Sequence, residues 1–195
     1  MEQSFQIKYI CTVTKKESIL NAALELLVQK GVHNTPMSQV AKAANTGMGT
    51  IYNYFPNKEI LINEIYLSIK KQEENLFLEV STDGPVKTRF ESYMTVLIVF
   101  FMEHPLYFNF LQQLEASPII TEENKTNGRK PVEIVASLLK SGQKDRIIKS
   151  VEMDQILVFI GGAISSYLRQ NLNTTQNKQT SLADHINMVW DGIKE

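Results

Sequence analysis

Residues 35–58 carry the pattern that most constrains how this chain folds. Ala41 is small enough for a second helix to cross closely, Asn45 tolerates the left-handed backbone of a tight turn, and Ile51 is an aliphatic residue of the next helical segment. This spacing predicts a helix-turn-helix over about residues 36–55. A helical hairpin that serves only as core has the same spacing, so that alternative stays open on the spacing alone.

Residues that favour helix ends frame this pattern. Thr35 is expected to cap the first helix, with Pro36 at the first helical position, where its missing N–H costs nothing. Pro56 ends the second helix, and Asn57 is expected to cap a longer helix that starts at Lys58 and runs to about residue 78.

A further helix is expected upstream of the helix-turn-helix. Thr14 and Glu17 have the spacing of a capping box, and Gly31 suits the left-handed end of the same helix. Residues 1–13 show no clean period, so they are interpreted as a flexible arm or as a forward extension of this helix.

Three blocks of this region resemble the N-terminal domain of the tetracycline-repressor (TetR) family. The blocks are residues 40–44, 49–55 and 58–61, and the resemblance covers roughly residues 14 to 64. The chain departs from the family at Asn45, where glycine is usual, and at Gly47 and Met48, where a capping serine and often a basic residue are usual. The second helix therefore lacks its usual charge.

The resemblance implies that the second helix enters the major groove of DNA. Thr50 and Asn53 suit hydrogen bonds to base edges, and Met48 suits packing on a thymine methyl group. The two tyrosines of this helix and the lysine that follows it match phosphate-binding residues of the family. The predicted DNA-binding residues are Thr35, Met48, Gly49, Thr50, Tyr52, Asn53, Tyr54 and Lys58.

Composition supports an all-α fold. The 195 residues include only 6 prolines and 9 glycines, and long stretches show helical periodicity. We expect a three-helix DNA-binding domain in residues 13–73 and a larger helical domain for ligand binding and dimerisation in residues 74–195. The net charge is −1, so DNA affinity must come from local charge placement, and residues 1–60 carry six lysines against four glutamates.

Several other classes of protein are not expected. Cys11 is the single cysteine, which excludes an internal disulfide and fits a reducing cytoplasm. The longest apolar run, residues 96–102, is far below the roughly 20 residues that span a bilayer, and the N-terminus lacks a signal-peptide pattern. His33, His104 and His185 lie apart, without metal-ligand spacing. No metal, cofactor, catalytic residue or membrane association is therefore expected.

Aromatic residues gather at helical spacing in the first half of the larger domain. They form either plain core or the wall of a cavity. A cavity of this composition favours a largely apolar effector that a few polar groups orient. The candidate pocket residues are Phe90, Tyr93, Phe100, His104, Tyr107 and Phe108.

Two apolar helical stripes near the C-terminus, in residues 153–168 and 182–193, exceed what one neighbouring helix can cover. They predict a homodimer, and Gly161 and Gly162 indicate close approach of another helix. Residues 121–130 and 172–181 are expected to be polar loops, and residues 141–145 a connector. The candidate dimer-interface residues are Ile156, Ile160, Ile164, Tyr167, Ile186 and Trp190.

These expectations describe a ligand-responsive transcriptional repressor that binds a near-palindromic double-stranded DNA operator as a dimer. A largely apolar or amphipathic small molecule releases it. The alternative is a helical small-molecule-binding protein or enzyme that uses the C-terminal cavity without binding an operator.

Overall fold

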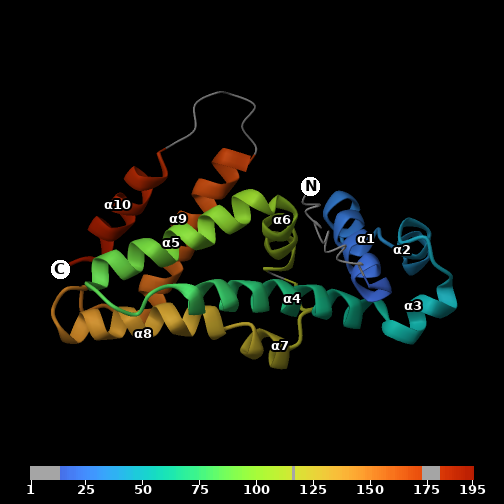
Figure 1. Cartoon of the computed structure of the whole chain (residues 1–195), viewed down its shortest axis with the longest axis horizontal. Helices are drawn as coiled ribbons and strands as arrows, with labels where there is room; N and C mark the ends of the chain where they lie inside the picture. Colours follow the sequence, from blue (N-terminus) through green and yellow to red (C-terminus); the bar gives the residue numbers. More distant parts are fainter. Residues whose placement is uncertain (1–13, 116, 173–180) are drawn as a thin grey trace, which may run out of the picture. The chain divides into compact units, whose positions relative to one another are not determined.

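In the computed structural model, residues 14–115, 117–172 and 181–195 are described, and they form ten α-helices and no named strand (Figure 1). The all-α prediction is confirmed. The interpretation of residues 1–13, the environment of Cys11 and most of the loop expected at residues 172–181 lie outside this part of the chain. The helices are α1 (Lys15–Lys30), α2 (Met37–Ala43), α3 (Met48–Tyr54), α4 (Lys58–Glu79), α5 (Val86–Glu103), α6 (Pro105–Leu114), α7 (Glu122–Asn127), α8 (Lys130–Lys144), α9 (Met153–Leu172) and α10 (Leu182–Ile193).

The chain divides into two compact units, and the division falls between Leu61 and Ile62, within α4. Asn63 shows why the second unit starts so early in this helix. Its side-chain amide donates to the Ile119 carbonyl at 2.8 Å, and its carbonyl oxygen accepts from the Thr121 N–H at 3.2 Å. The packing boundary thus precedes residues 73–74, where sequence analysis placed the functional domain boundary.

The first helix of the N-terminal unit begins and ends as its sequence indicates. The Glu17 N–H donates to the Thr14 hydroxyl at 3.2 Å, and the Thr14 N–H donates to the Glu17 carboxylate at 2.7 Å. This reciprocal pair is the predicted capping box. Gly31 ends α1 with φ of +81°, a conformation in which a Cβ would be strained.

Thr35 does not cap α2, so that prediction is wrong. Pro36 is the N-cap residue, and the Thr35 side chain is fully buried. Its hydroxyl donates to the carbonyls of Leu26 at 3.2 Å and Gly31 at 2.9 Å. The hydroxyl therefore ties the residue before α2 to the end of α1, where the Gly31 carbonyl has no helical N–H within reach.

In the C-terminal unit, α5 is the central helix and packs against α6, α8, α9 and α10 (Figure 1). Pro105 starts α6, and α5 and α6 are bent by 99° at the break between them. Within the described residues no single helix is long and apolar enough to cross a membrane, although this bent pair passes the same test of length and composition.

Two segments expected to be irregular are helical. Residues 121–130 contain α7, whose first turn is capped because the Asn124 N–H donates to the Thr121 hydroxyl at 3.2 Å. Residues 141–144 continue α8 through Gly142, which is buried. A Cβ at Gly142 would lie 2.7 Å from Cγ1 of Ile148. This glycine therefore permits close packing instead of ending the helix.

Candidate nucleic-acid interface and cavity

The helix-turn-helix is held by the residues that its sequence spacing singled out. Ala41 is buried where α2 and α3 pack, and Ile51 and Phe55 are fully buried. Asn45 has φ of +48°, the left-handed conformation that the turn requires. The Thr46 N–H donates to the Ala41 carbonyl at 3.0 Å, which closes the end of α2.

The opposite face of α3 is exposed and carries no charge. Tyr52 and Tyr54 are 48% and 44% exposed, and Gly49 and Asn53 are exposed as well. Met48 and Thr50 are half-buried. This face thus presents hydroxyl and amide groups, the thioether of Met48 and the backbone at Gly49, which no side chain covers. Such a combination suits base edges and phosphate oxygens in a groove.

Lys58 has a protein partner in this structure. Its ammonium group donates to the Val32 carbonyl at 2.8 Å, and the side chain is half-buried. Asn57 caps α4, as predicted, because the Ile60 N–H donates to its side-chain oxygen at 2.8 Å. Lys58 therefore lies in the first turn of a helix, where the partial positive charge of the helix end also attracts anions. Thr35, by contrast, has no exposed side chain to offer DNA.

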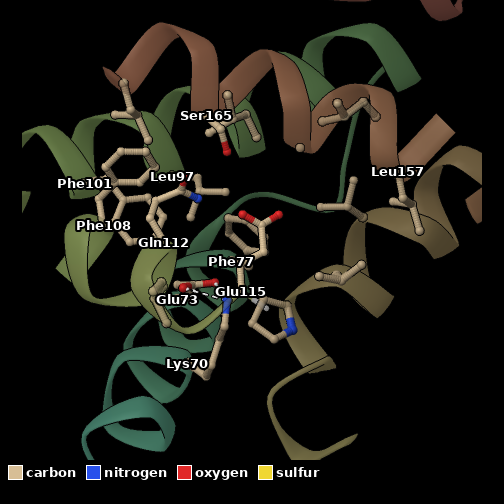
Figure 2. Close-up of a pocket in the computed structure, with 18 of the residues that line it drawn as sticks. Lys70, Glu73, Phe77, Leu97, Phe101, Phe108, Gln112, Glu115, Leu157 and Ser165 are labelled. Carbon is tan, nitrogen blue, oxygen red and sulfur yellow. Dashed lines mark hydrogen bonds and ion pairs between the residues drawn. The ribbon is translucent and has the colours of Figure 1, made fainter. Parts of the chain in front are cut away.

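The C-terminal unit contains a partly open cavity of about 420 Å³ between α4, α5, α6, α8 and α9 (Figure 2). Most of its wall is apolar. Phe101 of α5 and Phe108 of α6 lie together at one side, with ring centroids 6.0 Å apart. The apolar lining comprises Phe77, Met94, Leu97, Phe101, Phe108, Leu111, Leu114, Ile120, Pro131, Val132, Val135, Leu157, Ile160, Ile164 and Leu168.

Only two of the six predicted pocket residues, Tyr93 and Phe108, line this cavity. Phe90 instead packs against Trp190, with ring centroids 5.6 Å apart. Phe100, His104 and Tyr107 stack on one another at centroid distances of 5.0 to 5.7 Å. The structure does not place these four residues at this cavity. Phe90 lies near the start of α5 against Trp190 of α10, and the other three stack on one another where α5 meets α6.

The polar end of the cavity lies on α4 and was not predicted from the sequence. Tyr66, Lys70, Glu73 and Phe77 line it, and their spacing of four, three and four residues places them on one helix face. The Lys70 ammonium lies 3.0 Å from both oxygens of Glu73, and Figure 2 shows the pair side by side. That spacing was the available signal.

Glu73 is a charged group in an enclosed place, since only 4% of the residue is exposed. Burial raises the pKa of its carboxyl above the ordinary value, and the neighbouring Lys70 charge acts in the opposite direction. The pKa of Tyr66 is also raised, first by burial and then by the negative charge of Glu73. The carboxylate is therefore costly to hold in the folded chain.

The residues predicted for the dimer interface form the interior of the single chain. Ile156, Ile160, Tyr167, Ile186 and Trp190 are buried, and Ile164 lines the cavity, so this assignment is also wrong. The exposed apolar residues of α9 and α10 are on other faces: Val158 is 75% exposed, Met188 is 61% exposed, and Phe159 is about half exposed. A Cβ at Gly161 or Gly162 would meet nothing within 4 Å in this chain.

Among the described residues, no three His, Cys, Asp or Glu side chains come together as a metal site would require.

A turn closed by a left-handed asparagine and a second helix anchored by Ile51 and Phe55 define a helix-turn-helix protein of the DNA-binding class. Residues 19–65 match the family described as bacterial regulatory proteins, tetR family. The match assigns the N-terminal DNA-binding domain of the chain to this family.

Known proteins resemble the chain at two levels. The uncharacterized HTH-type transcriptional regulator YhgD of Bacillus subtilis is 44% identical over 61 residues, which are 31% of this chain and 32% of that protein. The match thus spans about a third of the length of this curated relative.

The fold as a whole is also found in solved structures. A TetR family transcription regulator of Marinobacter aquaeolei VT8 is 20% identical with a TM-score of 0.83, covering 93% of this chain and 96% of that one. The regulator FadR of Bacillus subtilis, solved with stearoyl-CoA, is 21% identical with a TM-score of 0.71, covering 89% and 95%. At these identities the likeness shows the fold alone.

Proposed function

We propose that this protein is a ligand-responsive transcriptional repressor. It binds a near-palindromic DNA operator as a homodimer and leaves the operator when a largely apolar small molecule occupies the cavity. The observation that carries the proposal is the exposed, uncharged, hydrogen-bonding face of α3 above fully buried Ile51 and Phe55, in a unit that matches the tetR family. Because chromosomal DNA is the partner, we place the protein in the cytoplasm.

The DNA contacts divide by chemistry. Thr50 and Asn53 read base edges, Met48 packs on a thymine methyl group, and Gly49 lets the backbone approach the groove. The hydroxyls of Tyr52 and Tyr54 bind phosphates together with Lys58, which must exchange the Val32 carbonyl for a phosphate oxygen. Thr35 is withdrawn from the list of contacts because its side chain is buried.

Two copies joined through α9 and α10 present two recognition helices to DNA, which is why the operator is near-palindromic. The exposed apolar residues Val158, Phe159 and Met188 support this pairing. A Cβ at Gly162 would meet nothing of this chain within 4 Å, so a helix of the second copy can approach there. The proposed interface thus lies on the two helices that the sequence predicted, α9 and α10, but uses their exposed residues instead of their buried ones.

The effector fills the cavity of the C-terminal unit. Its mostly apolar wall supports a ligand held by burial, and FadR, which shares the fold, was solved with a long-chain acyl-CoA. Helix α4 begins at Lys58 and carries Tyr66, Lys70, Glu73 and Phe77 of the cavity wall further along. A ligand that binds better to one position of α4 releases the operator, and a 100-fold difference in affinity amounts to about 2.7 kcal/mol.

The test is a salt-titrated mobility-shift assay on DNA flanking the protein's own gene, with a scrambled duplex as competitor. Specific retention by the wild-type protein is expected. Thr50→Ala and Asn53→Ala should change which base pairs are preferred, whereas Gln29→Ala, an exposed change on α1, should not. Equal affinity of the wild type for every duplex would contradict the proposal.

A helical small-molecule-binding protein or enzyme without an operator remains the second candidate, and the cavity is the observation that favours it. The same assay separates the two functions. A protein of the second kind binds its ligand but shows no DNA retention that depends on sequence.

A further inference from the structure

We propose that the cavity selects a largely apolar molecule with one positive charge, and that Glu73 receives this charge in place of Lys70. The inference rests on the proposed function, in which this cavity is the effector site, and names the chemical class of the effector. It is carried by three observations: the inventory of charges that line the cavity, the difference in exposure between Lys70 and Glu73, and the aromatic lining.

Four ionisable side chains besides the tyrosines line the cavity: Lys70, Glu73, Glu115 and Lys125. Both cations already have carboxylate partners, since Lys70 binds Glu73 and Lys125 lies 2.7 Å from the exposed Glu122. Glu115 has no ion-pair partner among the described residues. The two lysines and two glutamates of the lining therefore balance in number. Because Glu115 is exposed and Glu73 is buried, the Lys70–Glu73 pair decides which charge the cavity accepts.

The Lys70–Glu73 pair is asymmetric in its access to water. The Lys70 side chain is 20% exposed on a flexible four-carbon stem, whereas the Glu73 side chain is only 5% exposed. A cationic ligand at Glu73 displaces an ammonium group that can turn toward solvent. An anionic ligand at Lys70 would instead leave the buried Glu73 carboxylate beside a second negative charge, which is far more costly.

Aromatic rings strengthen the same preference. Tyr66 and Phe77 of α4, Tyr93 and Phe101 of α5 and Phe108 of α6 all contribute to the wall. The face of each ring attracts a cation when the ring lies within about 6 Å, and the attraction grows when water is excluded. The rest of the lining is aliphatic, so the remainder of the ligand must be apolar. A volume of about 420 Å³ lies within the range of small-molecule sites.

The test compares three molecules of one chain length and different head charge: decylamine, which is protonated at neutral pH, decan-1-ol and decanoate. Their affinities are measured by titration calorimetry below micelle-forming concentrations, on the full-length protein. Decylamine is expected to bind at least about 10-fold more tightly than either of the others, which corresponds to about 1.4 kcal/mol. In Glu73→Gln, the ratio of the affinities for decylamine and decan-1-ol should fall to about 1.

Two further variants separate recognition from general damage. Glu74→Gln removes the same charge from the next position of α4, where the carboxylate is paired with Lys71 at 2.9 Å and does not line the cavity. It should leave the preference for decylamine unchanged. Lys70→Met removes the competing cation and should preserve or increase that preference. Circular dichroism and thermal unfolding verify that each variant is folded.

Three outcomes would overturn the inference: equal affinity for decylamine and decan-1-ol, tightest binding of decanoate with loss of that binding in Lys70→Met, or no binding of any of the three. The mobility-shift assay keeps this failure separate from failure of the proposed function. A protein that retains operator DNA but shows one of these results is a regulator with a different effector. If the protein binds decylamine selectively but does not retain DNA, the inference about the cavity stands and the proposed repressor function is refuted.

Discussion

Lys58 is a residue with two competing partners. In the structure its ammonium group donates to the Val32 carbonyl, which ties the start of α4 to the connection between α1 and α2. On DNA we expect the same group to bind a phosphate, because the N-terminus of α4 adds a partial positive charge at this point. The exchange replaces a neutral acceptor by a charged one, which makes a stronger hydrogen bond.

Replacing Lys58 should weaken DNA binding without changing its sequence preference. Lys58→Ala removes one phosphate contact per protomer, so affinity should fall for every duplex and the slope of log K against log salt should become less steep by about 0.9 per lost contact. Mobility-shift assays at several salt concentrations measure both quantities. Lys58→Arg retains the charge and is the control. A Lys58→Ala protein with an unchanged slope and an altered base preference would refute the phosphate assignment.

Glu73 and Glu74 are adjacent residues whose carboxyl pKa values shift in opposite directions. Burial raises the pKa of Glu73 above its ordinary value of 4.5, whereas the hydrogen bond from Lys71 lowers the pKa of the half-buried Glu74. The contribution of Glu73 to stability is therefore present below pH 4.5 and is lost as the pH rises through its higher folded pKa. The contribution of Glu74 is present above pH 4.5 and is lost as the pH falls through its lower folded pKa.

The substitutions Glu73→Gln and Glu74→Gln should consequently change the free energy of unfolding with opposite dependences on pH. Between about pH 4 and pH 7, the free energy of unfolding of Glu73→Gln should rise relative to the wild type, because the variant has no buried carboxyl to ionise. Glu74→Gln should lose stability relative to the wild type as the pH rises toward 4.5 from below. Urea unfolding at a series of pH values measures both differences. Parallel curves of unfolding free energy against pH for the two variants would show that burial does not determine the pKa of Glu73.

At the scale of the element, α8 illustrates a glycine kept for its size. Gly142 lies inside the helix, and a Cβ there would be 2.7 Å from Cγ1 of Ile148 and 3.1 Å from Cγ1 of Val86. Alanine normally stabilises a helix interior by about 1 kcal/mol relative to glycine. Here both neighbours are β-branched and packed, so the clash outweighs that gain.

Gly142→Ala should therefore destabilise the protein by roughly 1–3 kcal/mol, the usual cost of overpacking. Gly161→Ala, in α9, is the matched change where nothing lies within 4 Å, and it should be neutral or stabilising by up to about 1 kcal/mol. Urea unfolding compares the two variants. A stabilising Gly142→Ala would mean that Ile148 and Val86 move aside at little cost.

At the scale of the whole molecule, dimerisation depends on which faces of α9 and α10 the single chain leaves open. Val158 and Met188 are exposed large apolar residues, so a charge at either should give a folded monomer. A monomer presents only one recognition helix, so Val158→Glu and Met188→Glu should bind DNA poorly. Sedimentation velocity at micromolar concentration, together with the mobility shift, measures both effects.

Leu78→Glu is the control for the dimer prediction, because Leu78 is 66% exposed on α4 and lies outside α9 and α10. It should remain dimeric. Charges at the buried Ile186 would instead disrupt the interior, and loss of folding in that variant carries no information about the interface. A wild-type protein that sediments as a monomer would end the homodimer proposal.

Sequence alone determined the features that depend on local geometry. The capping box at Thr14 and Glu17, the left-handed turn at Asn45 and the cap of α4 at Asn57 each follow from a backbone preference that a few adjacent residues express. The buried positions of Ile51 and Phe55 follow from helical period in the same way. The helix-turn-helix is built from such short-range signals, so it was predictable.

Only the tertiary structure decided what lies against each helix face. Helical period groups residues on one side, but it does not say whether that side meets a neighbouring helix, a cavity or water. Ile160 and Ile164 share a stripe that resembles an interface and in fact lines the cavity, and Lys70 and Glu73 look like an exposed pair although Glu73 is buried. Gly142 was interpreted as part of a connector, because glycine often ends a helix. The sequence does not show whether a glycine is used for its conformational freedom or for its small size. Distant residues such as Ile148 determine which property is used, and they become its neighbours only when the chain folds.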